Sequence, residues 1–219
     1  MTAVVKACLI DVWQTILFGD FQARVESLTA YAGVDTEVWL AEWLRTAVER
    51  DRGEISVADS VAQALRVCGV EPRPELIADL MRQDAEEMRE TVRLYDDSVP
   101  FLTSLRSKGI LIALVSNCSD TTRPILGHLG VFPLVDAAIL SCEVRSAKPS
   151  PEIYLAALEA LGVAAADAVF IDDQHGYCAG AEVVGVRAIQ ITRHESPGLP
   201  APAPDFPIVR SLLEVAPLL

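Results

Sequence analysis

Short apolar runs recur along the second half of the chain, and each has the length of a buried strand. After Tyr95 such runs occupy residues 110–115, 137–140, 168–171 and 188–191, and the segments between them are long enough to hold helices. A further run, at residues 4–10, lies near the start of the chain. Strands that alternate with helices form parallel sheets, which bury both faces and favour uninterrupted apolar sequences. The pattern predicts an α/β fold around a parallel sheet.

A different periodicity fills the stretch between the first run and the others. Apolar residues recur at spacings of three and four over residues 21–32, 37–52, 57–67 and 74–92, which predicts four helices. These helices would form an insertion over residues 17–93, within a core made of residues 1–16 and 94–219. Ser56, with Asp59 three residues later, predicts the start of the third helix. Five prolines within residues 196–207 predict an extended tail before a last helix at 209–218.

Composition narrows the classes of function. The net charge of −13 argues against a nucleic-acid partner, because most of the surface would repel a polyanion. No run of eighteen apolar residues occurs, so no membrane span is expected. The first residues lack the pattern of a secretory signal, which favours a cytoplasmic location. The five cysteines are scattered without close pairs, which argues against a disulfide framework and against a zinc site.

Polar residues follow several of the predicted strands at the point where each strand ends. Asp11 ends the first run, Ser116-Asn117 ends the run at 110–115, and Asp172-Asp173 ends the run at 168–171. Ligands of open parallel sheets bind at the carboxyl edge, where these residues would meet. Taken singly, each also fits a simpler role, because aspartates are common in turns and Ser-Asn can cap a helix.

Lys148 and the Asp172-Asp173 pair are candidates for a charged site. A lone lysine is usually solvated, but a lysine beside a carboxylate crevice would pair with Asp11 and with a bound anion. Two adjacent carboxylates repel each other unless a cation or solvent relieves the repulsion. A hard divalent ion held by oxygen ligands would do so, which makes a metal site a reasonable hypothesis.

Taken in order, these segments resemble the haloacid dehalogenase superfamily of aspartyl-nucleophile hydrolases. The resemblance rests on the strand that ends in Asp11, the helical insertion, Ser116-Asn117, the segment from Lys148 to Tyr154, and Asp172-Asp173 followed by Gly180-Ala181. It implies a Rossmann-like sheet with an inserted four-helix cap. It also implies a small-molecule substrate and a monomer or homodimer.

The resemblance also implies a role for each motif residue. Asp11 would be the nucleophile, Thr15 and Ser116 would hydrogen-bond its carboxylate or the transferring group, and Lys148 would balance charge. Asp173, supported by Asp172, would hold Mg²⁺ together with Asp11 and the backbone carbonyl of Trp13.

At Trp13 the chain departs from the pattern of the phosphatases in this superfamily. These enzymes carry a second aspartate two residues after the nucleophile, which protonates the leaving oxygen and then activates water. An indole cannot do this, because its N–H is a donor without useful acidity. Haloacid dehalogenases carry an aromatic residue there, but they work without a metal and typically have Ser-Ser-Asn where this chain has Asp172-Asp173-Gln174. The sequence therefore combines features of both branches.

Three hypotheses remain open. The first is a magnesium-dependent hydrolase of a small organic phosphate or related ester, which takes its proton from substrate, water or a cap residue. The second is a 2-haloacid dehalogenase, in which Arg45 on the second predicted helix would grip the substrate carboxylate. The third is a catalytically impaired binding protein whose site Trp13 plugs. Trp13, Asn117 and Trp43 are further candidate substrate contacts, although Trp43 also fits the packing of the cap core.

Overall fold

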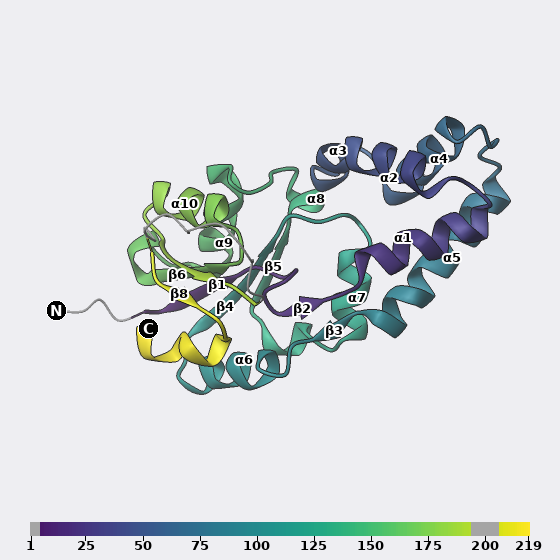
Figure 1. Cartoon of the computed structure of the whole chain (residues 1–219). Helices are drawn as coiled ribbons and strands as arrows, with labels where there is room; N and C mark the ends of the chain where they lie inside the picture. Colours follow the sequence, from purple (N-terminus) through teal and green to yellow (C-terminus); the bar gives the residue numbers. More distant parts are fainter. Residues whose placement is uncertain (1–4, 194–205) are drawn as a thin grey trace.

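The apolar runs form the strands of one parallel sheet in the computed structural model, which describes residues 5–193 and 206–219. The sheet has the order β5-β4-β1-β6-β7-β8, and every neighbouring pair is parallel. Its strands are β1 (Ala7–Ile10), β4 (Leu111–Ser116), β5 (Ala137–Leu140), β6 (Ala168–Asp172), β7 (Arg187–Ile191) and β8 (Ile208–Val209). The predicted α/β class is confirmed. Strand β1 lies inside the sheet between β4 and β6 (Figure 1).

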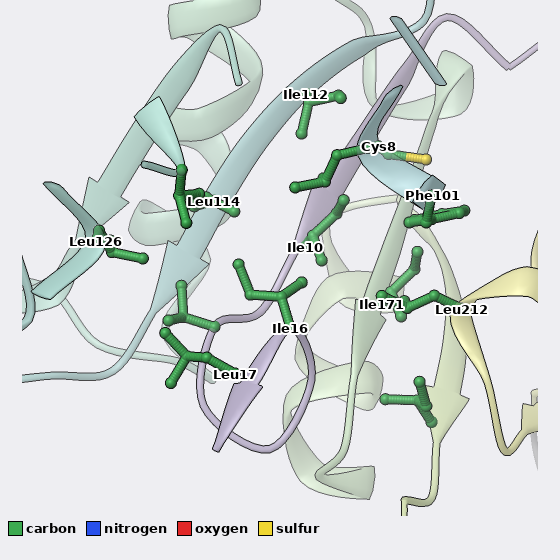
Figure 2. Close-up of a cluster of buried hydrophobic side chains, with 14 of the residues drawn as sticks. Cys8, Ile10, Ile16, Leu17, Phe101, Ile112, Leu114, Leu126, Ile171 and Leu212 are labelled. Atoms are coloured by element: carbon green, nitrogen blue, oxygen red, sulfur yellow. The ribbon is translucent and has the colours of Figure 1, made fainter. Parts of the chain in front are cut away.

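The two faces of the sheet are covered by separate hydrophobic clusters. Cys8 and Ile10 of β1 point into one cluster, which Figure 2 shows together with Phe101 and Leu212. Successive side chains of a strand point to opposite faces, so Ala7 and Leu9 belong to the second cluster. All four β1 side chains are fully buried. Burial of a side chain such as Leu9 contributes roughly 1.5–3 kcal/mol, so the position of β1 is strongly determined.

Helices supply the outer layers of the sheet. The first cluster includes residues of α6 and α7, and the second includes residues of α9 and α10. These helices are α6 (Ser98–Ser107), α7 (Thr122–His128), α9 (Pro151–Leu161) and α10 (His175–Val183). The short helix α8 (Ser141–Val144) follows β5 directly. Within the described parts of the chain, no helix combines the length and the apolar character needed to cross a bilayer.

The insertion contains five helices where four were predicted. They are α1 (Phe21–Ala32), α2 (Thr36–Arg45), α3 (Ala47–Asp51), α4 (Val57–Val67) and α5 (Pro74–Thr91). The predicted helix at 37–52 is interrupted at Thr46, whose hydroxyl donates to the carbonyls of Glu42 and Trp43. Such side-chain bonds to the preceding turn compete with the backbone ladder and bend helices, and here α3 begins as a separate turn.

The insertion has a hydrophobic core of its own, and two paired strands connect it to the rest of the chain. Trp39, Leu65 and Leu80 are fully buried in its hydrophobic cluster. Strands β2 (Leu17–Phe18) and β3 (Arg93–Leu94) pair antiparallel where the chain enters and leaves the insertion. In Figure 1 the insertion extends away from the sheet, with α1 and α5 side by side and α3 turned back toward α8. We retain the division into residues 17–93 and a core of 1–16 plus 94–219 as a proposal.

The end of the chain differs from the prediction. The expected extended tail falls largely on residues 194–205, which lie outside the described residues. The single helix predicted at 209–218 is wrong: β8 pairs with β7, and two short 3-10 turns follow at Leu212–Glu214 and Ala216–Leu218. Pro217 lies at the start of the second turn, and a proline cannot continue a helix that begins further upstream.

A glycine fixes how closely the insertion approaches the core. Gly53 has φ +64°, and a Cβ built on it would lie 1.9 Å from the backbone carbonyl oxygen of Cys142 in α8. Gly33, at the end of α1, has φ +67° but nothing within 4 Å of its Cβ position. The two glycines therefore share a backbone conformation and differ in their surroundings.

We predict that Gly53→Ala destabilises the protein more than Gly33→Ala. The left-handed conformation alone should cost Gly33→Ala about 1–2 kcal/mol, and the added clash should bring the cost for Gly53→Ala to about 2–5 kcal/mol. Urea denaturation of the two variants measures the free energy of unfolding. Equal losses would show that the close contact between α3 and α8 is absent in solution.

Candidate active site

The order of the sheet brings three of the predicted motifs to one edge. Strand β1 pairs with β4 and with β6, so that Ile10 lies opposite both Leu114 and Ile171. The backbone N–H of Asp11 donates to the carbonyl of Ile171 at 2.9 Å. The residues that follow these strands therefore meet at the carboxyl edge of the sheet, as the sequence predicts for a parallel sheet.

A buried lysine joins two of these carboxylates. Nζ of Lys148 lies 2.5 Å from Oδ1 of Asp11 and 2.6 Å from Oδ2 of Asp172. All three residues are buried. Burial by itself would lower the pKa of Lys148, but the charges of Asp11 and Asp172 raise it above its ordinary value. The lysine is therefore a fixed cation beside Asp11.

Asp173 completes a cluster of three carboxylates. One carboxylate oxygen from each of Asp11, Asp172 and Asp173 lies within 4.8 Å of the other two. Burial, followed by the charge of Asp11, raises the pKa of Asp172 and of Asp173. The second oxygen of Asp172 accepts from the backbone N–H of Gln174 at 2.7 Å, so Asp172 is engaged on both sides. Oxygen ligands of this kind suit a hard divalent cation, which would relieve the remaining repulsion.

Asn117 holds the backbone of Lys148 in place. Its side-chain amide donates to the Lys148 carbonyl at 2.9 Å and to the Tyr177 hydroxyl at 3.2 Å, and its carbonyl oxygen accepts from the Lys148 N–H at 2.7 Å. The Lys148 ammonium also lies 5.0 Å from the centre of the Tyr177 ring. Asn117 was predicted as a substrate contact, and the structure places it as a clamp on the lysine.

The loop after Asp11 is held in an uncommon conformation. Gln14 has φ +60°, which is rare for a residue with a side chain. Tyr95 donates to the Gln14 side chain at 3.1 Å, and Arg193 donates to the Thr15 carbonyl at 3.2 Å. The Thr15 hydroxyl is buried and has no partner among the described residues. A buried hydroxyl left unpaired costs about 1–3 kcal/mol, so a bound group that accepts a hydrogen bond from Thr15 would be stabilised there. Ser116, also buried, donates weakly at 3.5 Å to the Asn117 carbonyl.

A cavity of about 220 Å³ opens between this loop and the insertion. Trp13 lines it from the core, and its indole N–H lies 3.4 Å from the hydroxyl of Thr122. Trp43 lines it from α2 while also packing in the core of the insertion. We name this space the Trp13 cavity. Its walls are therefore aromatic on both sides.

The cations at the Trp13 cavity are not the one that was predicted. Arg45 is exposed and pairs with Glu42 at 2.7 Å and with Gln63 at 3.1 Å, and it does not line the cavity. Arg50 and Arg24 line it instead. Helical spacing alone does not identify Arg50, because the predicted helix is interrupted at Thr46, between Trp43 and Arg50.

Arg50 is held over the aromatic wall. Its guanidinium carbon lies 3.9 Å from the centre of a Trp43 ring, and its Nη1 donates to the hydroxyls of Thr46 at 2.5 Å and Ser60 at 3.1 Å. Burial lowers the pKa of Arg50 to about 10, so it remains a cation at neutral pH. Arg24 forms a two-pronged pair with Asp84. The lining of the cavity therefore contains two arginines, beside the carboxylates of Asp20 and Asp51.

Several known proteins resemble this chain along most of its length. It is 26% identical over 230 residues to (S)-2-haloacid dehalogenase 4A of Burkholderia cepacia, covering 100% of this chain and 96% of that protein. It is 29% identical over 227 residues to the glyceraldehyde 3-phosphate phosphatase of Methanopyrus kandleri, covering 97% of each. Phosphatase MT3486 of Mycobacterium tuberculosis is 31% identical over 136 residues, which cover 56% of this chain and 63% of that protein. The chain thus spans less than two thirds of that relative.

A solved structure and a family of related sequences also match this chain. The crystal structure of a HAD phosphatase from Thermococcus onnurineus superposes with a TM-score of 0.69 at 23% identity, covering 98% of this chain and 97% of that one, which shows a shared fold. The family described as haloacid dehalogenase-like hydrolase matches residues 5–185. With its sheet, its helical insertion and its carboxylate edge, the chain belongs to the haloacid dehalogenase-like hydrolase family.

Proposed function

We propose that this hydrolase is magnesium-dependent and cleaves a small organic phosphate, with Asp11 as the nucleophile. The observation that carries the proposal is the cluster of Asp11, Asp172 and Asp173 within 4.8 Å beside the buried Lys148. A dehalogenase that works without a metal does not require two further carboxylates at this edge. A phosphoryl group, by contrast, needs neighbouring positive charge to approach a carboxylate nucleophile.

The chain's own residues fit two successive displacements. The Asp11 carboxylate attacks phosphorus, the bond from phosphorus to the leaving oxygen breaks, and that oxygen departs with the electron pair. Water then attacks the phosphorus of the acyl phosphate, which releases inorganic phosphate and restores Asp11. Thr15 and Ser116 hydrogen-bond the transferring group, and Lys148 balances the charge of Asp11.

The carboxylate edge fits a resident Mg²⁺. Asp11, Asp173 and the backbone carbonyl of Trp13 would hold the ion, with Asp172 supporting the site through Lys148. When bound, Mg²⁺ supplies neutralising charge to the oxygens of the transferred group. The raised pKa values of Asp172 and Asp173 reflect burial and the charge of Asp11, and a bound cation would offset both effects by favouring the charged carboxylates.

The Trp13 cavity favours a small anionic substrate with an apolar portion. Its volume of about 220 Å³ lies below that of common drug-sized sites, which are roughly 300–1,000 Å³. Trp13 and Trp43 supply apolar walls, and Arg50 supplies positive charge. We therefore propose that residues 17–93 act as a cap that selects the substrate.

A second candidate function is the hydrolytic dehalogenation of short 2-halo acids. Trp13 favours it, because a halide leaves without a proton, and a haloacid dehalogenase aligns with the whole chain. In this alternative Arg50, rather than Arg45, would face the substrate carboxylate. A protein in which Trp13 plugs the site and no reaction occurs is the remaining alternative.

Magnesium binding and turnover test the proposal. We expect Mg²⁺ to bind by calorimetry, phosphate release from small phosphate esters to require Mg²⁺, and Asp11→Asn to lower the rate by roughly 10³-fold or more. Asp35→Asn is the matched control, because Asp35 caps α2 away from the site and asparagine caps equally well. Halide release from 2-chloropropionate that survives chelation would favour the dehalogenase instead. Absence of turnover with both substrate classes would leave the binding protein.

The buried ion pairs give a stability prediction. Lys148→Met keeps the apolar stem and leaves Asp11 and Asp172 without a cation, so unfolding of the chelator-treated protein should become easier by about 3–5 kcal/mol at pH 8. The loss should shrink near pH 5, because burial and the charge of Asp11 raise the pKa of Asp172, so the folded variant takes up a proton on Asp172 as the pH falls. Urea denaturation at both pH values measures this effect.

The matched control is the exposed pair between Lys6 and Asp167, which are 2.7 Å apart. The Lys6 side chain is 62% exposed, so Lys6→Met should change the free energy of unfolding by less than about 1 kcal/mol. A loss in Lys148→Met as small as that of the control would contradict the buried network.

A further inference from the structure

Cleavage of a phosphate ester needs a proton donor for the leaving group, and the core of this protein has no evident one. The leaving oxygen of an alkyl phosphate needs a proton as its bond to phosphorus breaks. Trp13 stands two residues after Asp11, and its indole N–H points to the Thr122 hydroxyl at 3.4 Å. Lys148 is committed to Asp11 and Asp172. If the proposed phosphatase function holds, on which this inference rests, the acid must come from another residue.

Asp51 lies at two hollows between the insertion and the carboxyl edge of the sheet. It ends α3 and lines the Trp13 cavity together with Trp13 and Gln14. It also lines a second hollow, of about 390 Å³, together with Asn117 and Lys148. Asp51 therefore borders both the cavity beside the loop that follows Asp11 and the hollow beside Lys148. It places a carboxylate of the insertion near the edge where position 13 carries a tryptophan instead of an aspartate.

The position of Asp51 is fixed by the contact between the insertion and the core. Helix α3 contacts α8, and Gly53 lies against the Cys142 carbonyl two residues after Asp51. Just beyond, the Val57 N–H donates to the Asp120 side chain at 3.2 Å. These contacts hold the end of α3 against the carboxyl edge of the sheet, as Figure 1 shows for α3 and α8.

The surroundings of Asp51 raise the pKa of its carboxyl above the ordinary value. Burial raises its pKa above the ordinary value, although Arg50 and Lys148 pull in the opposite direction. Arg50 precedes it on α3, Lys148 faces it from the loop before α9, and Tyr177 lies within electrostatic reach on α10. A carboxyl that keeps its proton to higher pH is a better general acid near neutrality.

We propose that Asp51 is the general acid and base of this hydrolase, supplied by the insertion in place of the residue at position 13. The Asp51 carboxyl gives its proton to the leaving oxygen as the bond to phosphorus breaks, and the alcohol departs. The Asp51 carboxylate then takes a proton from the water that attacks the acyl phosphate. That transfer restores both Asp51 and Asp11.

Two substrates with different leaving groups test this role in the full-length protein with Mg²⁺. Ethyl phosphate releases an alcohol and needs the proton, whereas acetyl phosphate releases a carboxylate and does not. We expect Asp51→Asn to lower kcat/KM for ethyl phosphate by about 10²–10⁴-fold and to change kcat/KM for acetyl phosphate only a few-fold. The ratio kcat/KM is the right quantity, because it reports the steps up to departure of the leaving group.

Two companion variants separate chemistry from structure. Asp51→Glu keeps the acid and should recover part of the activity on ethyl phosphate, whereas Asp35→Asn makes the same chemical change away from the site and should keep full activity on both substrates. In the wild type, kcat/KM for ethyl phosphate should fall at high pH as the acid loses its proton, and Asp51→Asn should abolish this fall.

Two results would contradict a role for Asp51 as the general acid. Equal losses on the two substrates would show that Asp51 only shapes the site, and unchanged activity on ethyl phosphate would show that another group supplies the proton; either result overturns the proposal while Asp11 remains the nucleophile. If the wild type hydrolyses neither substrate with Mg²⁺, the phosphatase function itself fails, and the role of Asp51 fails with it.

Discussion

The buried lysine between two aspartates is the contact on which the site depends. Lys148 comes from the loop before α9, while Asp11 and Asp172 come from two neighbouring strands, so one ammonium links three separate segments. Removing charges from water is costly, and only the close pairing compensates for it. Asn117 holds the lysine backbone from a fourth segment. The arrangement holds the Asp11 carboxylate in a fixed position and shields it from solvent.

The insertion brings charged residues to the carboxyl edge of the sheet. The edge has the carboxylates, the lysine and the unpaired Thr15 hydroxyl, but no acid at position 13. Helix α3 brings Arg50 and Asp51 to the cavities beside that edge. A positive charge and a carboxyl with a raised pKa are what a small phosphate ester would need from the opposite wall. In the proposed function, selection of the substrate and transfer of the proton therefore both come from the insertion.

The features that follow from a local sequence pattern were predicted correctly from the sequence, and those that depend on particular side-chain bonds or on strand pairing were not. The strands were predicted because burial on both faces demands apolar runs, and the start of α4 because Ser56 and Asp59 form a capping box within one turn. The break at Thr46 was missed, because it depends on side-chain bonds that include Arg50 from the next turn. The final helix was wrong because pairing with β7 and the presence of Pro217 outweighed its apolar pattern.

The sequence by itself determined the class of sheet, the family, and the order of the residues that meet at its carboxyl edge. These follow from local patterns, because a strand that ends in a polar residue delivers that residue to the same edge wherever the strand lies in a parallel sheet. Only the tertiary structure decided which cation and which carboxylate of the insertion line the cavities beside that edge. That choice depends on the rotation of α3 after the break at Thr46 and on its docking against α8, and both arise from contacts between residues far apart in the chain.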